Sequence, residues 1–152
     1  MTSGQRGLAL PLALLTLIVI GAVVGGGFVL GLLEQRTGRN ALYLVQAAGA
    51  AEAGAAAVVA EWQAHGLGAL LPGDSASLAV VRLEGGAEYQ ATVHRLNAEL
   101  FELRVAGTRT DADGGTLARR ELGLVLRAAD SAAAGESSVT PLANRAWTWL
   151  TP

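Results

Sequence analysis

The sequence predicts an α+β fold, in which one long N-terminal helix packs on a four-stranded antiparallel β-meander. The first observation behind this prediction is an apolar run, residues 8–33, that passes into an alanine-rich stretch with helical spacing. The second is a set of later segments in which apolar and polar residues alternate, the pattern of strands with one buried face. A helix followed by consecutive strands is the element order of the α+β class.

The apolar run contains no charged residue between Arg6 and Glu34. Its roughly 26 residues would span about 39 Å as an α-helix, whereas the hydrocarbon core of a bilayer is roughly 30 Å thick. The run is therefore predicted to cross a membrane. Glycines at a spacing that lets helices approach closely in lipid interrupt it, at Gly21, Gly25, Gly27 and Gly31. Both a loosely packed anchor and a helix packed against sibling helices are compatible with these glycines.

Three interpretations compete for the first 33 residues: a secretory signal peptide, a plain single-pass anchor and a helix with a short cleavable leader. A signal peptide has a shorter apolar core and a small-residue cleavage site, whereas this run ends in Leu-Leu-Glu-Gln-Arg. Positive charge lies on both sides, with Arg6 before the run and Arg36 and Arg39 after it. The charge distribution therefore does not decide the orientation across the membrane.

The helix is predicted to continue as an amphipathic segment over residues 34–66. Alanine has the highest helix propensity, and this compensates for the glycines in the segment. Gly66, Gly68 and the Pro72-Gly73 pair are expected to end it. One helical face is predicted to carry Leu42, Val45 and Gly49, and another Leu44, Ala48, Ala51, Ala55, Val58 and Trp62.

A sheet domain is predicted over residues 67–130, with strands at 77–84, 88–96, 100–108 and 118–128. A Gly85-Gly86 pair is a hairpin signal between the first two. The opposite, polar face is rich in Arg and Glu, and the amphipathic helix is expected to cover the apolar face. That apolar face is predicted to contain Ala79, Val81, Leu83, Tyr89, Ala91, Val93, Phe101, Leu103, Val105, Leu122, Leu124 and Leu126.

The last segment, residues 131–152, is predicted to be a loop or tail because it begins with a Ser/Ala/Gly-rich stretch. Near its end, Trp147 and Trp149 would share a face if the backbone is extended. These side chains either pack back onto the sheet domain or form an exposed aromatic patch for a partner subunit.

Composition argues against several classes of function. The net charge of -2 gives no electrostatic basis for binding nucleic acid. The absence of cysteine excludes disulfides, zinc–thiolate sites and thiol catalysis. Asp111 and Asp113 precede a glycine but lack the further ligands of a calcium loop, and His65 and His94 have no ligand-spaced companions. We therefore expect no enzymatic activity, no cofactor and no metal. A secreted enzyme would need cleavage near Leu33 and catalytic residues that the strands do not supply.

The N-terminal region carries a resemblance to a known family. A short polar leader that ends in Gly7, followed directly by the apolar helix from Leu8, resembles the prepilin signal of type IV pilins and type II secretion pseudopilins. Two sequence motifs after the apolar run resemble the N-terminal region of PilX-type minor pilins. They are E-Q-R-x-G-R-N, which begins at Glu34, and Q-A-A-x-A-A-E-A-G, which begins at Gln46. With the leader, the resemblance covers about a third of the chain.

This resemblance implies a filament subunit. A prepilin peptidase would cleave between Gly7 and Leu8, and methylation would accompany this processing. The mature subunit would lie in the inner membrane as a single-pass protein, with a cytoplasmic N-terminus and an extracytoplasmic sheet domain. An assembly platform would then transfer it from the lipid bilayer into a filament at the cell surface. Glu is found at the fifth mature position of major pilins, whereas this chain has Leu12, which implies a minor component.

We therefore expect a structural subunit, a minor pilin or pseudopilin, whose partners are other pilin or pseudopilin subunits. The alternative is a single-pass membrane-anchored protein with a small extracytoplasmic binding domain and no filament role. The leader, residues 1–7, would be absent from the mature filament subunit. Subunit contacts are expected at Glu34, Arg36, Arg39, Glu52, Trp147 and Trp149.

Overall fold

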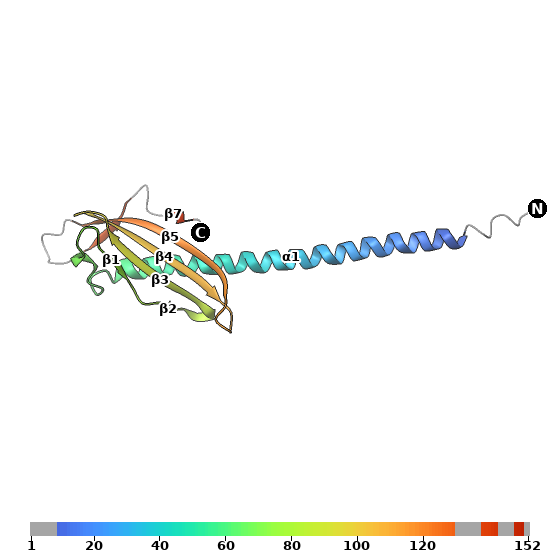
Figure 1. The fold of residues 1–152 in the computed structure, drawn as a ribbon, viewed down its shortest axis with the longest axis horizontal. Helices are drawn as coiled ribbons and strands as arrows, with labels where there is room; N and C mark the ends of the chain where they lie inside the picture. Colours follow the sequence, from blue (N-terminus) through green and yellow to red (C-terminus); the bar gives the residue numbers. More distant parts are fainter. Residues whose placement is uncertain (1–8, 130–137, 143–147, 151–152) are drawn as a thin grey trace, which may run out of the picture. The chain divides into compact units, whose positions relative to one another are not determined.

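The computed structural model describes residues 9–129, 138–142 and 148–150. They belong to two units, Met1–Arg39 and Asn40–Pro152. The described part of the first unit is helical, and the second contains helix and an antiparallel sheet (Figure 1). The predicted α+β class is therefore confirmed. The expected leader and the Gly7–Leu8 junction lie outside the described residues.

Helix α1, Ala9–Ala60, contains 52 residues, and the predicted continuation of the apolar run into the alanine-rich stretch is confirmed. Pro11 is tolerated because it lies in the first turn, where its missing N–H has no intrahelical acceptor. After Ala60 the chain continues in turns to Gly66, whose φ of 64° lies in the left-handed region. A short 3-10 helix, η1, follows at Leu67–Ala69.

The sheet has β3, β4 and β5 at its centre, and all its neighbouring strands are antiparallel. On one side both β1 and β2 pair with β3, and on the other both β6 and β7 pair with β5. Each edge of the central meander thus carries two short strands. The bounds are β1 Ser75–Ser77, β2 Val81–Arg82, β3 Ala87–Arg95, β4 Leu100–Thr110, β5 Thr116–Ala128, β6 Val139–Pro141 and β7 Thr148–Leu150.

The central strands form close to where alternation predicted them, and the predicted face of each is buried. Val93 pairs with Leu103, which in turn pairs with Leu124, so one apolar row crosses the sheet. Pairs such as these lie on the same side of a sheet because side chains alternate along every strand. The buried residues of this inner face are Ala91, Val93, Phe101, Leu103, Val105, Leu122, Leu124 and Leu126.

The predicted strand at 77–84 is wrong. Two short strands, β1 and β2, replace it, and the chain between them has one residue more than the opposing part of β3, since Ser77 pairs with Thr92 but Val81 pairs with Tyr89. An extra residue reverses the side to which later side chains point. Before this slip Leu78 packs against the core, and the next residue, Ala79, is therefore exposed. A 3-10 turn, η2 (Glu84–Gly86), then reverses the chain where the Gly85-Gly86 hairpin signal was predicted.

The segment expected as a C-terminal tail also contains regular structure. Its described residues include β6 and β7, which pair with β5 at Leu126–Ala128 and at Glu121–Gly123. Each strand is only three residues long, too short for alternation to reveal it in the sequence. The tail thus supplies one edge of the sheet.

The second half of α1 covers the inner face of the sheet. Ala51, Ala55 and Val58 are buried, and Trp62 meets Phe101 edge to face with 5.1 Å between ring centroids. This confirms most of the predicted packing face, although Leu44 at its start stays 37% exposed. Alanine in the helix lets its backbone lie close to the strands, and this closeness sets the position of the surfaces described below.

Candidate functional site

The first candidate surface is the apolar part of α1. Every large hydrophobic side chain from Leu10 to Leu33 is between 45% and 73% exposed. The helix is long and apolar enough to cross a membrane, by length and composition. Removing such a surface from water gains roughly 25 cal/mol per Å² of apolar area, so an apolar surrounding is favourable for this part of the helix.

The glycines singled out in the sequence lie on this helix. An added Cβ at Gly21, Gly25, Gly27 or Gly31 would meet no atom within 4 Å. These glycines therefore serve no packing contact in the part of the chain that the structure describes. Leu12 is 66% exposed, and its carbonyl oxygen accepts a hydrogen bond from the Thr16 hydroxyl at 2.8 Å.

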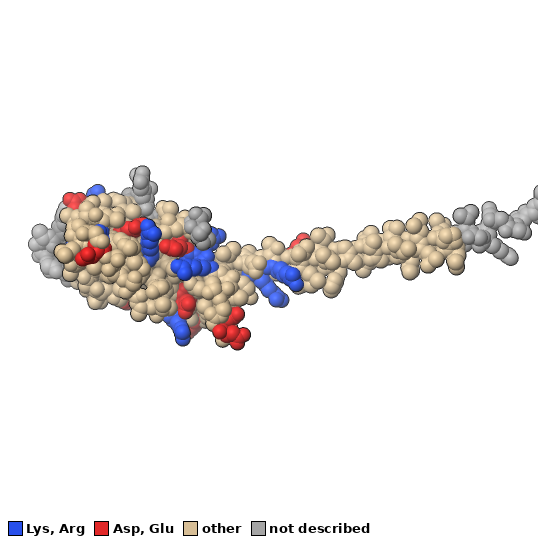
Figure 2. All heavy atoms as spheres, viewed as in Figure 1, with Lys and Arg blue, Asp and Glu red and all other residues tan. Residues whose placement is uncertain are grey.

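Charged side chains begin where the apolar run ends. Glu34, Arg36 and Arg39 are exposed on α1, and so is Glu52 farther along the same helix. The visible charge gathers around this stretch of α1 and on the sheet unit (Figure 2). None of these four residues forms an ion pair within the described ranges. Their side chains are therefore accessible for contacts with another molecule.

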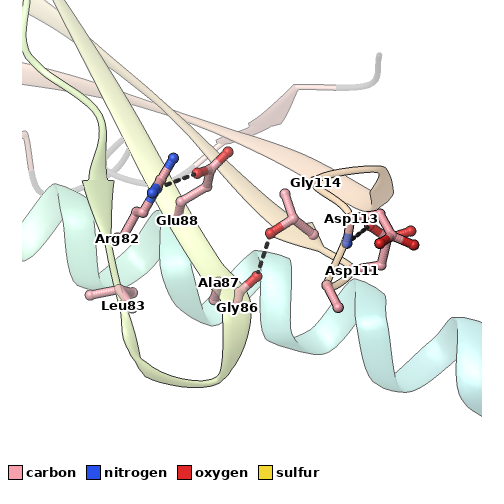
Figure 3. Close-up of a pocket in the computed structure, with 10 residues that line it drawn as sticks. Arg82, Leu83, Gly86, Ala87, Glu88, Asp111, Asp113 and Gly114 are labelled. Atoms are coloured by element: carbon pink, nitrogen blue, oxygen red, sulfur yellow. Dashed lines mark hydrogen bonds and ion pairs between the residues drawn. The ribbon is translucent and has the colours of Figure 1, made fainter.

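A polar hollow of about 490 Å³ lies between the β2–β3 turn and the β4–β5 loop (Figure 3). Arg82 and Glu88 form an ion pair of 3.8 Å on one wall. Asp111 and Asp113 stand on the opposite loop. Such a hollow can accept a small polar group, but its exposed ion pair contributes little binding energy of its own.

The acidic loop is a turn motif. Asp111 Oδ1 accepts backbone N–H bonds from Asp113 at 3.1 Å and from Gly115 at 2.6 Å, so its carboxylate closes the loop. His65 lies 3.6 Å from Glu61, and His94 stands on the polar face of β3. Over the described residues, His and acidic side chains nowhere gather in a group of three that could hold a metal ion.

A second, apolar hollow of about 330 Å³ lies beside the helix. Its walls are Leu44, Val45 and Ala48 of α1, Arg120 of β5 and Trp149 of β7. Trp149 pairs with Leu122 of the inner face and stays 43% exposed. Trp149 therefore has features of both predicted alternatives. Its backbone pairs with the sheet, as in packing back onto the domain, and its ring keeps an accessible surface, as in an exposed aromatic patch. Trp147 lies outside the described residues.

Two arginines, which the sequence did not single out, join distant segments. Arg95 donates hydrogen bonds to the carbonyl oxygens of Gly68, Leu70, Asn97 and Ala98, and its guanidinium lies 5.1 Å from the Phe101 ring centroid.

Arg109 joins distant segments at the other end of the sheet. It donates to Gln46 Oε1 at 2.8 Å and to the carbonyl oxygens of Gly86 and Thr110. Its guanidinium also lies 5.9 Å from the Tyr43 ring centroid. A planar guanidinium with five donors suits such bridging better than an ammonium. Only the three-dimensional arrangement reveals these roles.

The polar outer face carries further ion pairs, of which Arg104–Glu102 is the shortest at 3.0 Å. The hydrogen bond that Arg104 donates to the Glu102 carboxylate, followed by the attraction of the Glu102 charge, raises the pKa of Arg104 above the ordinary value. This guanidinium stays charged throughout the physiological range.

Comparison with known proteins finds no family model, no curated protein and no solved structure that matches this chain.

Proposed function

We propose that this chain is a structural subunit, a minor pilin or pseudopilin, of a type IV pilus or a type II secretion-like filament. The observation that carries the proposal is the exposed apolar surface from Leu10 to Leu33, on a helix whose later residues form the core of an antiparallel sheet domain. In this role the helix is first surrounded by lipid and then by sibling helices, an exchange with little net hydrophobic cost.

The small residues of the apolar run support this role. With no side chain at Gly21, Gly25, Gly27 and Gly31, a sibling helix can approach the backbone closely and gain van der Waals contact that lipid does not provide. The proposed partners are thus other pilin or pseudopilin subunits, together with a prepilin peptidase and an inner-membrane assembly platform. The sheet domain would lie on the extracytoplasmic side, with the N-terminus in the cytoplasm before assembly.

Leu12 favours a minor rank. A carboxylate at this position would pair with the N-terminal amine of a neighbouring subunit, and a leucine side chain cannot form that ion pair. Each added copy would then lack one attractive charge pair in a dry helix core. Such a subunit suits a few defined places in a filament better than the repeating body.

Filament fractionation tests the proposal. The chain is produced in cells with an active prepilin peptidase and filament machine, and surface filaments are sheared from the cells. We expect the chain in the sheared fraction, and its loss from that fraction when Gly7→Leu blocks processing at the proposed junction. A chain that stays wholly in the membrane fraction, with or without the substitution, would contradict the filament role and favour the membrane-anchored binding domain.

A further inference from the structure

The apolar hollow beside α1 has one unusual wall. Gly107 pairs with Arg120, and a Cβ on Gly107 would meet the helix backbone at Ala51, so this pair of positions faces the helix. Farther along the same face of β5 the residues are buried leucines. Arg120 therefore places a guanidinium at the border of an otherwise apolar surface.

Within the described residues Arg120 also lacks an acidic partner of the kind that three arginines of the outer face have. Arg82, Arg104 and Arg119 each lie within 4.0 Å of a glutamate on the outer face, whereas Arg120 forms no ion pair within the described part of the chain. An occupant that suits this hollow must bring apolar side chains together with a carboxylate, because the apolar walls favour the former and the guanidinium the latter.

The chain itself carries such a segment. Leu30, Leu33 and Glu34 stand at helical positions i, i+3 and i+4, so they share one face of α1. Both leucines are exposed, at 63% and 52%, and Glu34 forms no ion pair within the described residues.

Glu52 is the other exposed glutamate of α1 without an ion pair among the described residues. The residues at the same spacing before it are Ala48 and Ala51. Ala48 already lines the hollow and Ala51 lies in the core, so neither is available to fill a hollow on another molecule. The combination of a free carboxylate and large exposed apolar side chains therefore favours Glu34.

We propose that this hollow receives the Leu30–Glu34 segment of a second copy of the chain, with Glu34 of the partner subunit paired to Arg120. The proposal rests on the assembly role above and names the contact that performs it. In this contact Leu30 of the partner subunit lies beside Leu44, so the α1 helices of the two copies are displaced along their axes by about 14 residues. Because the two joined surfaces differ, the contact is heterologous and repeats from copy to copy into a ring or an open filament.

Cysteine cross-linking tests this contact directly, because the chain has no cysteine of its own. Full-length Val45→Cys and Leu33→Cys variants are mixed at high protein density in dodecyl maltoside micelles, where two copies can shift along their axes, and are oxidised. Val45 is 68% exposed at the hollow, so its replacement leaves the core intact. We expect a mixed disulfide at least tenfold more abundant than with Gln35→Cys, the matched control for Leu33→Cys, since Gln35 is exposed at nearly the same level on the opposite side of α1.

The charge pair is tested in the same micelles. Arg120→Glu in the Val45→Cys chain should lower the mixed disulfide at least tenfold, and Glu34→Arg in the Leu33→Cys chain should restore it. Equal yields for the Leu33 and Gln35 variants, or no response to the charge reversals, would overturn the proposal. A predominant Val45–Val45 disulfide would indicate a two-fold dimer instead. Equal protection of Val45→Cys from a water-soluble maleimide at all protein densities would show that detergent and not a second copy fills the hollow, and would also overturn the proposal.

The contact and the filament role can fail separately. A chain that is processed and found in sheared filaments, but forms no Val45–Leu33 disulfide there, would retain the role and lose the contact. A chain that forms this disulfide in micelles but is never processed or exported would retain the contact and lose the role.

Discussion

Gly107 of β4 lies directly against the backbone of Ala51 in α1. A Cβ on Gly107 would stand 2.5 Å from the Ala51 nitrogen and 3.1 Å from its Cα. The reverse also holds, since a Cβ on Gly54 of the helix would stand 2.5 Å from the Tyr89 ring on β3. Helix and sheet thus meet through a glycine on each side, and this brings the helix close enough for Val58 and Trp62 to enter the core.

The first prediction concerns this contact. Gly107→Ala should lower the free energy of unfolding by roughly 1–3 kcal/mol, because the methyl group forces helix and strand apart. Gly49→Ala is the matched control, since an added Cβ there meets nothing within 4 Å. It should be neutral or stabilising by up to about 1 kcal/mol. Urea unfolding of the full-length chain in detergent, followed by tryptophan fluorescence, measures both. A Gly107→Ala chain as stable as Gly49→Ala would show that the contact is not close.

The second prediction concerns Arg95. Its Nη2 donates to the Ala98 oxygen at 2.9 Å and its Nε to the Asn97 oxygen at 3.0 Å, so it holds the β3–β4 turn to the segment after α1. Arg95→Met should cost about 1–3 kcal/mol, since several carbonyl groups lose a charged donor. Arg104→Met removes an exposed ion pair and should cost at most about 1 kcal/mol. Thermal unfolding by circular dichroism separates the two, and equal costs would contradict the role given to Arg95.

The third prediction concerns Arg109, which joins Gln46 of the helix to Gly86 in the β2–β3 turn. Arg109→Met should cost about 1–2 kcal/mol and raise the hydrogen-exchange rate of backbone amides in residues 84–88. Arg127→Met on the exposed outer face is the control and should leave both quantities nearly unchanged. Exchange that is as slow in the Arg109 variant as in the control would mean that the turn holds its conformation without this side chain.

Local patterns predicted the elements whose signals are long. Alternation over roughly ten residues placed β3, β4 and β5, and helical spacing placed Ala51, Val58 and Trp62 in the core. The strand predicted at 77–84 failed because one extra residue before Val81 reverses the alternation, and no residue type marks that insertion. A single-residue slip of this kind depends on pairing with β3, which the sequence does not display.

The candidate surfaces also divide into those that a local sequence pattern reveals and those that only the fold assembles. The apolar run is visible in the sequence because its composition is uniform over its whole length. The hollow at Trp149 is not, since it brings together residues from α1, β5 and β7 that are up to about 100 positions apart. Arg95 and Arg109 resemble surface arginines in the sequence for the same reason. Their partners are backbone oxygens and a glutamine that only the fold brings near.

The most direct test of the central claim is the N-terminal residue of the mature chain. Full-length protein is purified from the membrane and filament fractions of cells with and without a prepilin peptidase, and its mass and N-terminal peptide are determined. A filament subunit should begin at Leu8 when the peptidase is present and at Met1 when it is absent. An intact Met1 in the membranes of cells with an active peptidase would contradict the account.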